Sequence, residues 1–174
     1  MCVNSVYLGL GSNVDRERHI ASALDALAEA FGELCISSVY ESEAVGFDGD
    51  HFLNLVVGCN TALSMGALSA CLRKIEDDNG RVRGGERFSA RTLDIDILLY
   101  SDVAGKVDGI TLPRTEILRN AFVLLPLAEI AGSERHPIEN KTYAELWRAY
   151  DRQQKLWPID FVWRGKVISC RKVS

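Results

Sequence analysis

The chain has 174 residues, a formal net charge of −4 and 47% hydrophobic residues. This length fits one domain with a sizeable core, and this apolar content argues against disorder. A mildly acidic balance argues against a general nucleic-acid binder, which needs a basic face to neutralise phosphates. The sequence has neither a signal-peptide pattern nor an apolar run long enough to span a membrane. Its five cysteines form no CxxC pair, so reduced thiols and a cytoplasmic location are expected.

The hydrophobic pattern predicts alternating strands and helices. In chain order the expected elements are a strand at 3–10, a helix at 20–31, strands at about 34–45 and 52–59, a helix that begins after Ser64, and a strand at 93–100. The order β-α-β-β-α-β is the ferredoxin-like pattern, so the fold class is α+β. In this topology the turn and the loops at 11–13, 46–51 and 80–92 meet at one end of the sheet.

Both helices of this core pack on one face of the sheet, so the other face needs cover. Residues 101–174 are expected to supply it, with a hairpin near 102–112 and helices near 122–131 and 142–150. The sequence therefore predicts one three-layer α-β-α domain over 1–174. Its core would span about 3–130, and a covering segment and tail would span 131–174.

The most informative motif is Arg91-Thr92-Leu93-Asp94-Ile95-Asp96-Ile97-Leu98. Side chains alternate along a strand, so Leu93, Ile95, Ile97 and Leu99 should point into one layer. Asp94 and Asp96 then share the other face, with Cα atoms roughly 7 Å apart. Mg²⁺ typically takes one or two carboxylates together with substrate phosphates. The pair therefore indicates a metal site, and the alternative is a pair of solvated charges at a strand edge.

The loop before that strand is basic. Residues 81–91 hold four arginines and one glutamate, a net charge of +3 in an acidic chain. Arginine binds phosphate oxygens through a planar fork and stays charged. The loop is either a polyphosphate site beside the carboxylates or an exposed, solvated segment.

A third pattern lies in the strand at 52–59. Phe52 and Asn54 share a strand face near the same end of the sheet. A planar heterocycle could stack on the ring while the amide reads its hydrogen-bonding edge. Core packing of Phe52 is the alternative interpretation.

With these motifs in place, the chain resembles the 6-hydroxymethyl-7,8-dihydropterin pyrophosphokinases of folate biosynthesis. The resemblance covers roughly 3–130 and includes LGLGSN, FLNLVV, IEDDNGRVR, RFSARTLDIDILLY and AFVLLPL, with RxxDxDxx as its most specific part. It implies a ferredoxin-like α+β fold and an enzyme that transfers diphosphate from ATP to the hydroxymethyl group of the pterin, releasing AMP.

The resemblance also implies roles for individual residues. Asp94 and Asp96 would hold two Mg²⁺ ions on the phosphates of ATP. The implied ATP-binding residues are Glu76, Arg81, Arg83, Arg91, Ile97, Arg114, Thr115 and Arg119. The implied pterin-binding residues are Ser42, Val45, Phe52, Asn54, Phe88, Asp94 and Phe122, with the pterin between Phe52 and Phe122. The catalytic set would be Arg81, Arg91, Asp94 and Asp96.

The chain also departs from the family pattern. Glu43, Gly84, Arg114 and Asn120 stand where other members often have Pro, Lys, His and Arg. These departures leave open a diverged paralogue that acts on a different pterin or is a pterin- or nucleotide-binding regulatory protein. An RNA-binding module is disfavoured because the chain lacks exposed aromatic residues on a basic sheet face. The expected partners are the small molecules ATP and hydroxymethyl dihydropterin, with no nucleic acid and no membrane, and a monomer is expected.

Overall fold

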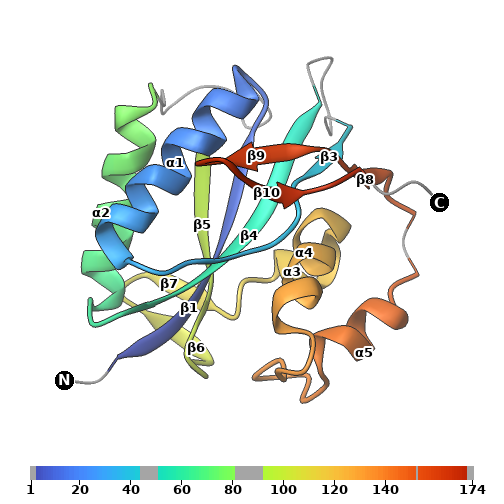
Figure 1. The fold of residues 1–174 in the computed structure, drawn as a ribbon. Coiled ribbons are helices and arrows are strands. Elements are labelled where there is room, and N and C mark those ends of the chain that lie inside the picture. Colours follow the sequence, from blue (N-terminus) through green and yellow to red (C-terminus); the bar gives the residue numbers. More distant parts are fainter. Residues whose placement is uncertain (1–2, 44–50, 81–91, 152, 172–174) are drawn as a thin grey trace.

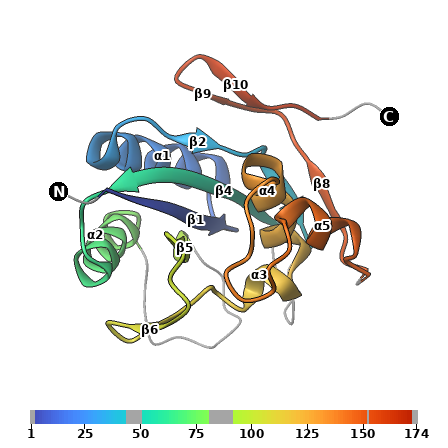
Figure 2. The same cartoon turned by 90° about the horizontal axis from the view of Figure 1, so that it is seen from below.

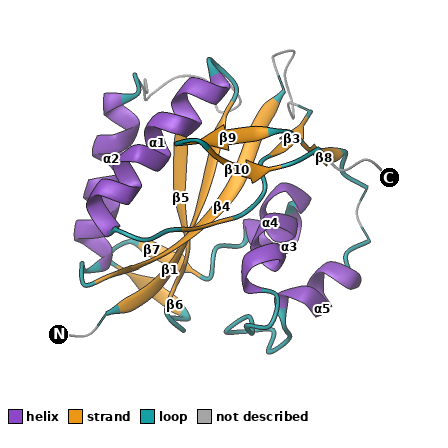
Figure 3. Cartoon of the chain, viewed as in Figure 1, coloured by secondary structure: helices purple, strands orange, loops and turns teal. Residues whose placement is uncertain are grey.

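The computed structural model describes residues 3–43, 51–80, 92–151 and 153–171 (Figures 1 and 3). In chain order its elements are β1 (Asn4–Ser12), α1 (Arg16–Phe31), β2 (Cys35–Ile36), β3 (Tyr40–Ser42), β4 (Phe52–Thr61), α2 (Met65–Asp78), β5 (Asp94–Tyr100), β6 (Gly105–Val107), β7 (Ile110–Leu112), α3 (Glu116–Arg119), α4 (Ala121–Ala131), α5 (Tyr143–Arg148), β8 (Leu156–Pro158), β9 (Phe161–Trp163) and β10 (Lys166–Ser169).

The main sheet confirms the ferredoxin-like order. Its strands run β5-β1-β4-β3-β8, with β2 also paired to β4, and every pairing is antiparallel. The long strands β1 and β4 form its centre, and β5 forms one edge. The predicted helix start at Ser64 is also confirmed, because its side chain accepts a hydrogen bond from the backbone N–H of Ala67.

Helices cover both faces of this sheet, as the views in Figures 1 and 2 show. On one face, apolar side chains of α1 and α2 pack on alternate residues of the strands, among them Leu53, Leu55 and Val57 of β4. On the other face, α3, α4 and α5 pack on residues that include Val56 and Leu99. Successive side chains of β4 therefore alternate between two core clusters, one on each face of the sheet. The predicted three layers are confirmed. That 1–174 form a single domain stays a prediction.

The strand predicted over about 34–45 is interrupted. Its two described parts are β2 and β3, and Ser37 lies between them. The Ser37 hydroxyl accepts a hydrogen bond of 2.9 Å from the backbone N–H of Val56. A side chain thereby takes the place of a backbone acceptor in the ladder, and the regular strand breaks there.

The expected orientation of Leu99 is wrong. Leu8 of β1 pairs with Ile97, whereas Tyr7 pairs with Leu99, so Leu98 is an extra residue in β5. Such a bulge shifts the alternation of side chains along a strand. Leu98 and Leu99 therefore both contact the core cluster under α4, while Ile97 keeps the predicted side.

The C-terminal segment contains strands that the sequence did not predict. Strand β8 pairs with β3 and extends the main sheet, and β9 and β10 form a hairpin. The hairpin lies against α1, where the indole N–H of Trp163 donates a 3.0 Å hydrogen bond to the Asp25 carboxylate. In the part of the chain that the structure describes, no helix has the length and apolar character needed to cross a membrane.

Candidate active site

Four strand ends meet at one end of the main sheet. Gly11 near the end of β1 lies between Asp94 at the start of β5 and Asn54 near the start of β4. At the outer side, Ser42 at the end of β3 pairs with Phe52. The topology expected from the sequence is thus confirmed, and it places the two carboxylates and the Phe52–Asn54 pair at the same end.

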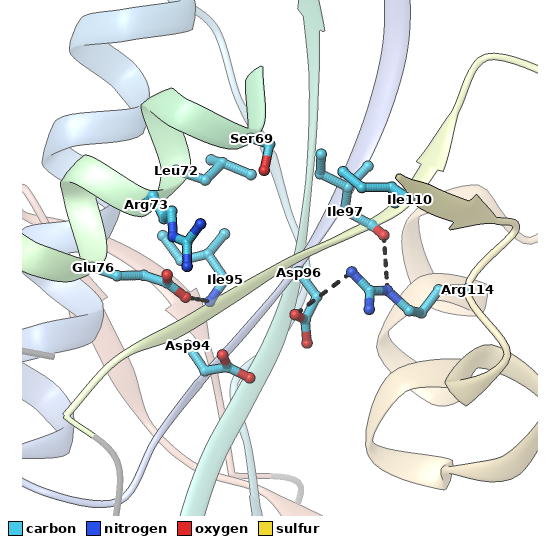
Figure 4. A pocket seen from close by; sticks show the side chains of 10 residues that line it. All are labelled: Ser69, Leu72, Arg73, Glu76, Asp94, Ile95, Asp96, Ile97, Ile110 and Arg114. Atoms are coloured by element: carbon cyan, nitrogen blue, oxygen red, sulfur yellow. Dashed lines mark hydrogen bonds and ion pairs between the residues drawn. The ribbon is translucent and has the colours of Figure 1, made fainter. Parts of the chain in front are cut away.

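Asp94 and Asp96 open into a pocket along the free edge of β5. The pocket has a volume of about 230 Å³. Figure 4 shows both carboxylates on the same side of β5, with Asp96 next to Arg114 and Asp94 further along the strand, below Glu76 of α2. The lining residues are Ser69, Leu72, Arg73, Glu76, Asp94, Ile95, Asp96, Ile97, Ile110 and Arg114. Glu76, Asp94, Asp96, Ile97 and Arg114 of the predicted ATP and metal set are therefore brought together.

Two side chains pair with backbone groups on this edge of β5. The buried Glu76 carboxylate accepts a 2.8 Å hydrogen bond from the N–H of Ile95. The Arg114 guanidinium donates through Nε to the carbonyl of Ile97 at 3.2 Å. An edge strand otherwise leaves such groups without a strand partner. Glu76 and Arg114 therefore fix the strand segment that carries the two aspartates.

Negative charge is concentrated at Asp96. Burial and the negative charges of Asp94, Glu76 and Glu116 raise the pKa of Asp96 to about 7, although the positive charge of Arg114 lowers it in part. The Arg114 guanidinium lies 3.7 Å from the Asp96 carboxylate. A carboxylate whose neighbours disfavour its charge gains from a nearby cation.

The donor set fits Mg²⁺ that is shared with a substrate. Across 3–43, 51–80, 92–151 and 153–171, no group of three or more His, Cys, Asp and Glu side chains could hold a metal ion by itself. Mg²⁺ usually takes only one or two carboxylates and completes its shell with water and phosphate oxygens. The two aspartates therefore suit a magnesium–polyphosphate site better than a metal site made by protein ligands alone.

The second half of the site lies across Gly11 from Asp94. The Asn54 amide donates a 3.0 Å hydrogen bond to the Ser42 hydroxyl, and both residues are buried. A Cβ atom on Gly11 would lie 3.1 Å from Oδ1 of Asn54 and 4.0 Å from Cδ1 of Phe52. The absence of a side chain on Gly11 thus lets the amide and the ring come close to the backbone of β1, on the sheet face that also carries Asp94.

The remaining predicted residues fall into two groups. Phe122 is half-buried in the first turn of α4, while Thr115 and Arg119 are exposed at the two ends of α3. The other group comprises Arg81, Arg83, Arg91, Val45 and Phe88, which lie outside the described residues. Their assigned roles stay predictions, including the catalytic roles of Arg81 and Arg91.

Sequence reasoning assigned no site role to five lining residues, Ser69, Leu72, Arg73, Ile95 and Ile110. The helical spacing contains a signal for two of them. Ser69 and Arg73 precede Glu76 by seven and three residues, so they share one face of α2 with it. Arg73 adds a positive charge to a pocket that, among the described lining residues, also contains Arg114. Ile110 comes from the β6–β7 hairpin, and its place depends on a long-range contact.

The fold and the site define an α+β protein with a paired-carboxylate pocket at one edge of an antiparallel sheet. Residues 7–132 match the family model described as 7,8-dihydro-6-hydroxymethylpterin-pyrophosphokinase, and the chain belongs to this family.

Individual relatives agree with this assignment. The chain is 40% identical over 146 residues to the 2-amino-4-hydroxy-6-hydroxymethyldihydropteridine pyrophosphokinase of Aquifex aeolicus, covering 82% of this chain and 89% of the relative. It is 37% identical over 131 residues to the Bacillus subtilis protein of the same name, covering 73% and 78%.

A crystal structure of Plasmodium falciparum HPPK-DHPS wild type has a similar fold, with a TM-score of 0.71 at 14% identity. It aligns with 97% of this chain, which spans 50% of the length of that longer protein. At this identity, the likeness supports the fold alone.

Proposed function

We propose that this protein transfers the diphosphate group of ATP to the hydroxymethyl group of 6-hydroxymethyl-7,8-dihydropterin and releases AMP, a step of folate biosynthesis. Family membership supports the proposal. The observation that carries it is the row Asp94, Gly11 and Asn54 across three neighbouring strands. In this proposal the row joins a metal–phosphate site at Asp94 to a site for a flat polar ring at Asn54.

The nucleotide half of the proposed site is the pocket along β5. Asp94 and Asp96 are the residues that would hold Mg²⁺, with two ions proposed, and the metal would offset the negative charge of the ATP phosphates. Arg114 and Arg73 add positive charge to the same pocket. Glu76 holds β5 in place through Ile95, which keeps the two aspartates in a fixed geometry.

The proposed pterin half lies on the sheet face over Gly11. The Asn54 amide donates to Ser42, and its carbonyl oxygen lies on the Gly11 side, where it can accept from a ring N–H or amino group. The Phe52 ring beside it offers a stacking surface. Phe122, in the first turn of the helix that covers this face, is proposed as the opposite wall.

In the proposed reaction the pterin hydroxyl oxygen forms a bond to the β-phosphorus of ATP. The bond from that phosphorus to the oxygen bridging the α- and β-phosphates breaks, and AMP leaves with this oxygen. Asp94 is common to both halves of the site, and we assign it to accept the hydroxyl proton. The protein forms no covalent bond to the substrates in this scheme, so positioning and electrostatic stabilisation account for most of the rate enhancement.

Product identification tests the proposal. Purified protein is incubated with ATP, Mg²⁺ and the hydroxymethyl dihydropterin, and the nucleotides are separated by chromatography. AMP should appear in equal amount with the pterin diphosphate, and neither should form without pterin or with excess chelator. Formation of ADP, or no nucleotide consumption at millimolar substrates, would overturn the activity. Pterin binding without turnover would favour a regulatory protein.

Two further expectations stay predictions. One is the monomeric state, which light scattering after size-exclusion chromatography would check. The other is the cytoplasmic location, which cell fractionation would check.

A further inference from the structure

The segment after α5 lies beyond the residues that match the family model, 7–132. From α5 the chain runs past the α3–α4 side and joins the outer edge of the main sheet at β8 (Figures 1 and 2). It contacts both sides of the proposed pterin site on the way. We call the residues that make these contacts, Tyr150, Gln154 and Trp157, the C-terminal brace.

The first set of contacts is at the N-terminus of α4. The N-cap residue of this helix, Asn120, makes no side-chain capping hydrogen bond. The Gln154 side chain caps it instead: its Oε1 accepts from the N–H of Ala121 at 2.6 Å, and its Nε2 donates to the carbonyl of Arg119 at 3.2 Å. The Tyr150 hydroxyl donates to the same carbonyl at 2.7 Å. These bonds fix the turn that contains Phe122.

The second set of contacts is on β3. Strand β8 pairs with β3 so that Trp157 lies opposite Glu41 and Leu156 opposite Ser42. The indole N–H of Trp157 donates to the Glu41 carboxylate at 3.0 Å. Without β8, the three-residue strand β3 would be an edge strand held by β4 alone. Short edge strands are weakly held.

The Glu41 carboxylate connects Trp157 to the residue before β4 through Arg16. It also accepts a 2.7 Å hydrogen bond from the Arg16 guanidinium, which donates in turn to the carbonyl of His51 at 2.9 Å. The His51 ring meets the Trp157 ring edge-on, with centroids 5.6 Å apart. His51 directly precedes Phe52. Trp157 therefore supports both residues of the Ser42–Phe52 pair.

The other end of α4 is held independently. The Glu129 carboxylate accepts hydrogen bonds from the N–H of Ser38 at 3.0 Å and the hydroxyl of Tyr40 at 3.1 Å. Glu129 follows Phe122 by seven residues, about two helical turns. Glu129 thus ties the far end of α4 to the sheet, whereas the brace ties the end that carries Phe122.

We propose that the C-terminal brace positions Phe52 and Phe122 relative to each other and thereby sets the affinity for the pterin. The inference rests on the proposed function, because it assumes that a flat ring lies between these two residues. A stacked ring needs two walls at a fixed separation, and small displacements of such walls weaken binding strongly. The brace residues are positioning residues, since they contact residues next to the two walls and not the ligand.

The test compares three variants. Trp157→Phe keeps an aromatic ring and removes the hydrogen bond to Glu41, and Gln154→Ala removes both bonds at the start of α4. Trp163→Phe is the matched control, because its indole makes the same kind of bond, 3.0 Å to the Asp25 carboxylate, in the same C-terminal segment but against α1. Pterin affinity is measured by calorimetry with Mg²⁺ and a saturating non-hydrolysable ATP analogue, and the affinity for that analogue is measured separately.

We expect Trp157→Phe and Gln154→Ala to weaken pterin binding by about 5- to 20-fold, the scale of one lost hydrogen bond, with nucleotide affinity within about twofold. Trp163→Phe should bind the pterin as the parent does. Gln154→Glu should recover only part of the affinity lost in Gln154→Ala, since its carboxylate can still accept from Ala121 and suits a helix N-terminus but cannot donate to the Arg119 carbonyl.

Three results would overturn the brace: parental pterin affinity in both variants, an equal loss in Trp163→Phe, or a parallel loss of nucleotide affinity. Because the readout is pterin affinity, the two proposals fail separately. A protein that binds the pterin without releasing AMP overturns the proposed activity alone. Unchanged pterin affinity in an active enzyme overturns the brace alone.

Discussion

The Glu76 carboxylate accepts a 2.8 Å hydrogen bond from the backbone N–H of Ile95, the residue between Asp94 and Asp96. Glu76 is 7% exposed and lies in the last turns of α2. A helix thereby fixes an edge strand where two acidic side chains project into the pocket. The same carboxylate adds to the negative charge that raises the pKa of Asp96. Glu76 therefore both holds β5 in place and favours the protonated form of Asp96.

The Glu76 contact predicts different outcomes for two substitutions. Glu76→Ala leaves the buried N–H of Ile95 without this acceptor and should lower the free energy of unfolding by about 1–3 kcal/mol. It should also lower turnover, because β5 loses a contact that holds the aspartates. Glu76→Gln keeps an acceptor oxygen and should retain most of the stability. Urea unfolding and Mg²⁺-dependent turnover check both, and equal stability of the two variants would contradict the role of the hydrogen bond.

The raised pKa of Asp96 predicts a pH-dependent stability in metal-free protein. Its folded-state pKa of about 7 lies above the value near 4 of an unfolded aspartate. The folded state therefore binds the proton more tightly, and the free energy of unfolding contributed by Asp96 falls as pH rises from about 4 to about 7. Its side chain is 45% exposed, so water screens part of the effect.

Asp96→Asn should remove this contribution. Urea unfolding of chelator-treated protein at several pH values should show the variant gaining stability relative to the parent as pH rises through this window. Mg²⁺ binding releases the same proton, so in the presence of nucleotide the apparent Mg²⁺ affinity of the parent should increase between pH 6 and pH 8. A constant stability difference across the window would show that Asp96 titrates normally.

The carboxylate pair predicts a loss of activity without a loss of fold. Asp94→Ala and Asp96→Ala should each reduce turnover by at least ~100-fold, the scale of a lost electrostatic contact in a transition state. Both variants should still unfold cooperatively. Asp102→Ala is a suitable control, because Asp102 is exposed in the turn at the other end of β5. Near-parental turnover in either site variant would mean that these charges are merely solvated.

Local patterns predicted the parts of the structure that depend on a few neighbouring residues. Alternation along β5 placed Asp94 and Asp96 on one face, and a capping residue marked the start of α2. The alternation failed at Leu99 because the bulge at Leu98 arises from pairing with β1, about 90 residues earlier in the sequence. A strand's own sequence contains little information about such a register shift.

Strands β8, β9 and β10 were not predicted for the same reason: short strands depend on pairing partners that can lie far away in the sequence. Strand β8 is a three-residue segment whose identity as a strand depends on pairing with β3. Trp157 and Gln154 also look like ordinary surface residues in the sequence, because their partners Glu41 and Ala121 are remote along the chain. The carboxylate pair was easier to predict, because the DxD spacing is a local pattern, whereas Glu76 was assigned only through the resemblance to the family.

Gly11 provides the sharpest test of where the pterin binds. It lies between Asn54 and Asp94 in the sheet register, and its backbone does not have the left-handed φ that would strain an alanine. A methyl group there would stand 3.1 Å from Oδ1 of Asn54, closer than an ordinary van der Waals contact. Gly11→Ala should therefore fold, yet crowd the amide that we assign to the ring edge of the pterin.

The expected result for Gly11→Ala is a loss of pterin affinity of about 10-fold or more, or roughly 1.4 kcal/mol, with nucleotide affinity nearly unchanged. Calorimetry with each ligand separates the two. Gly9→Ala is the comparison, because a methyl there meets the Leu98 side chain at 3.4 Å, an ordinary contact, and should cost less pterin affinity. If Gly11→Ala bound the pterin as the parent does, the ring would have to lie away from Asn54. If it weakened both ligands equally, the methyl group would be distorting the sheet end as a whole.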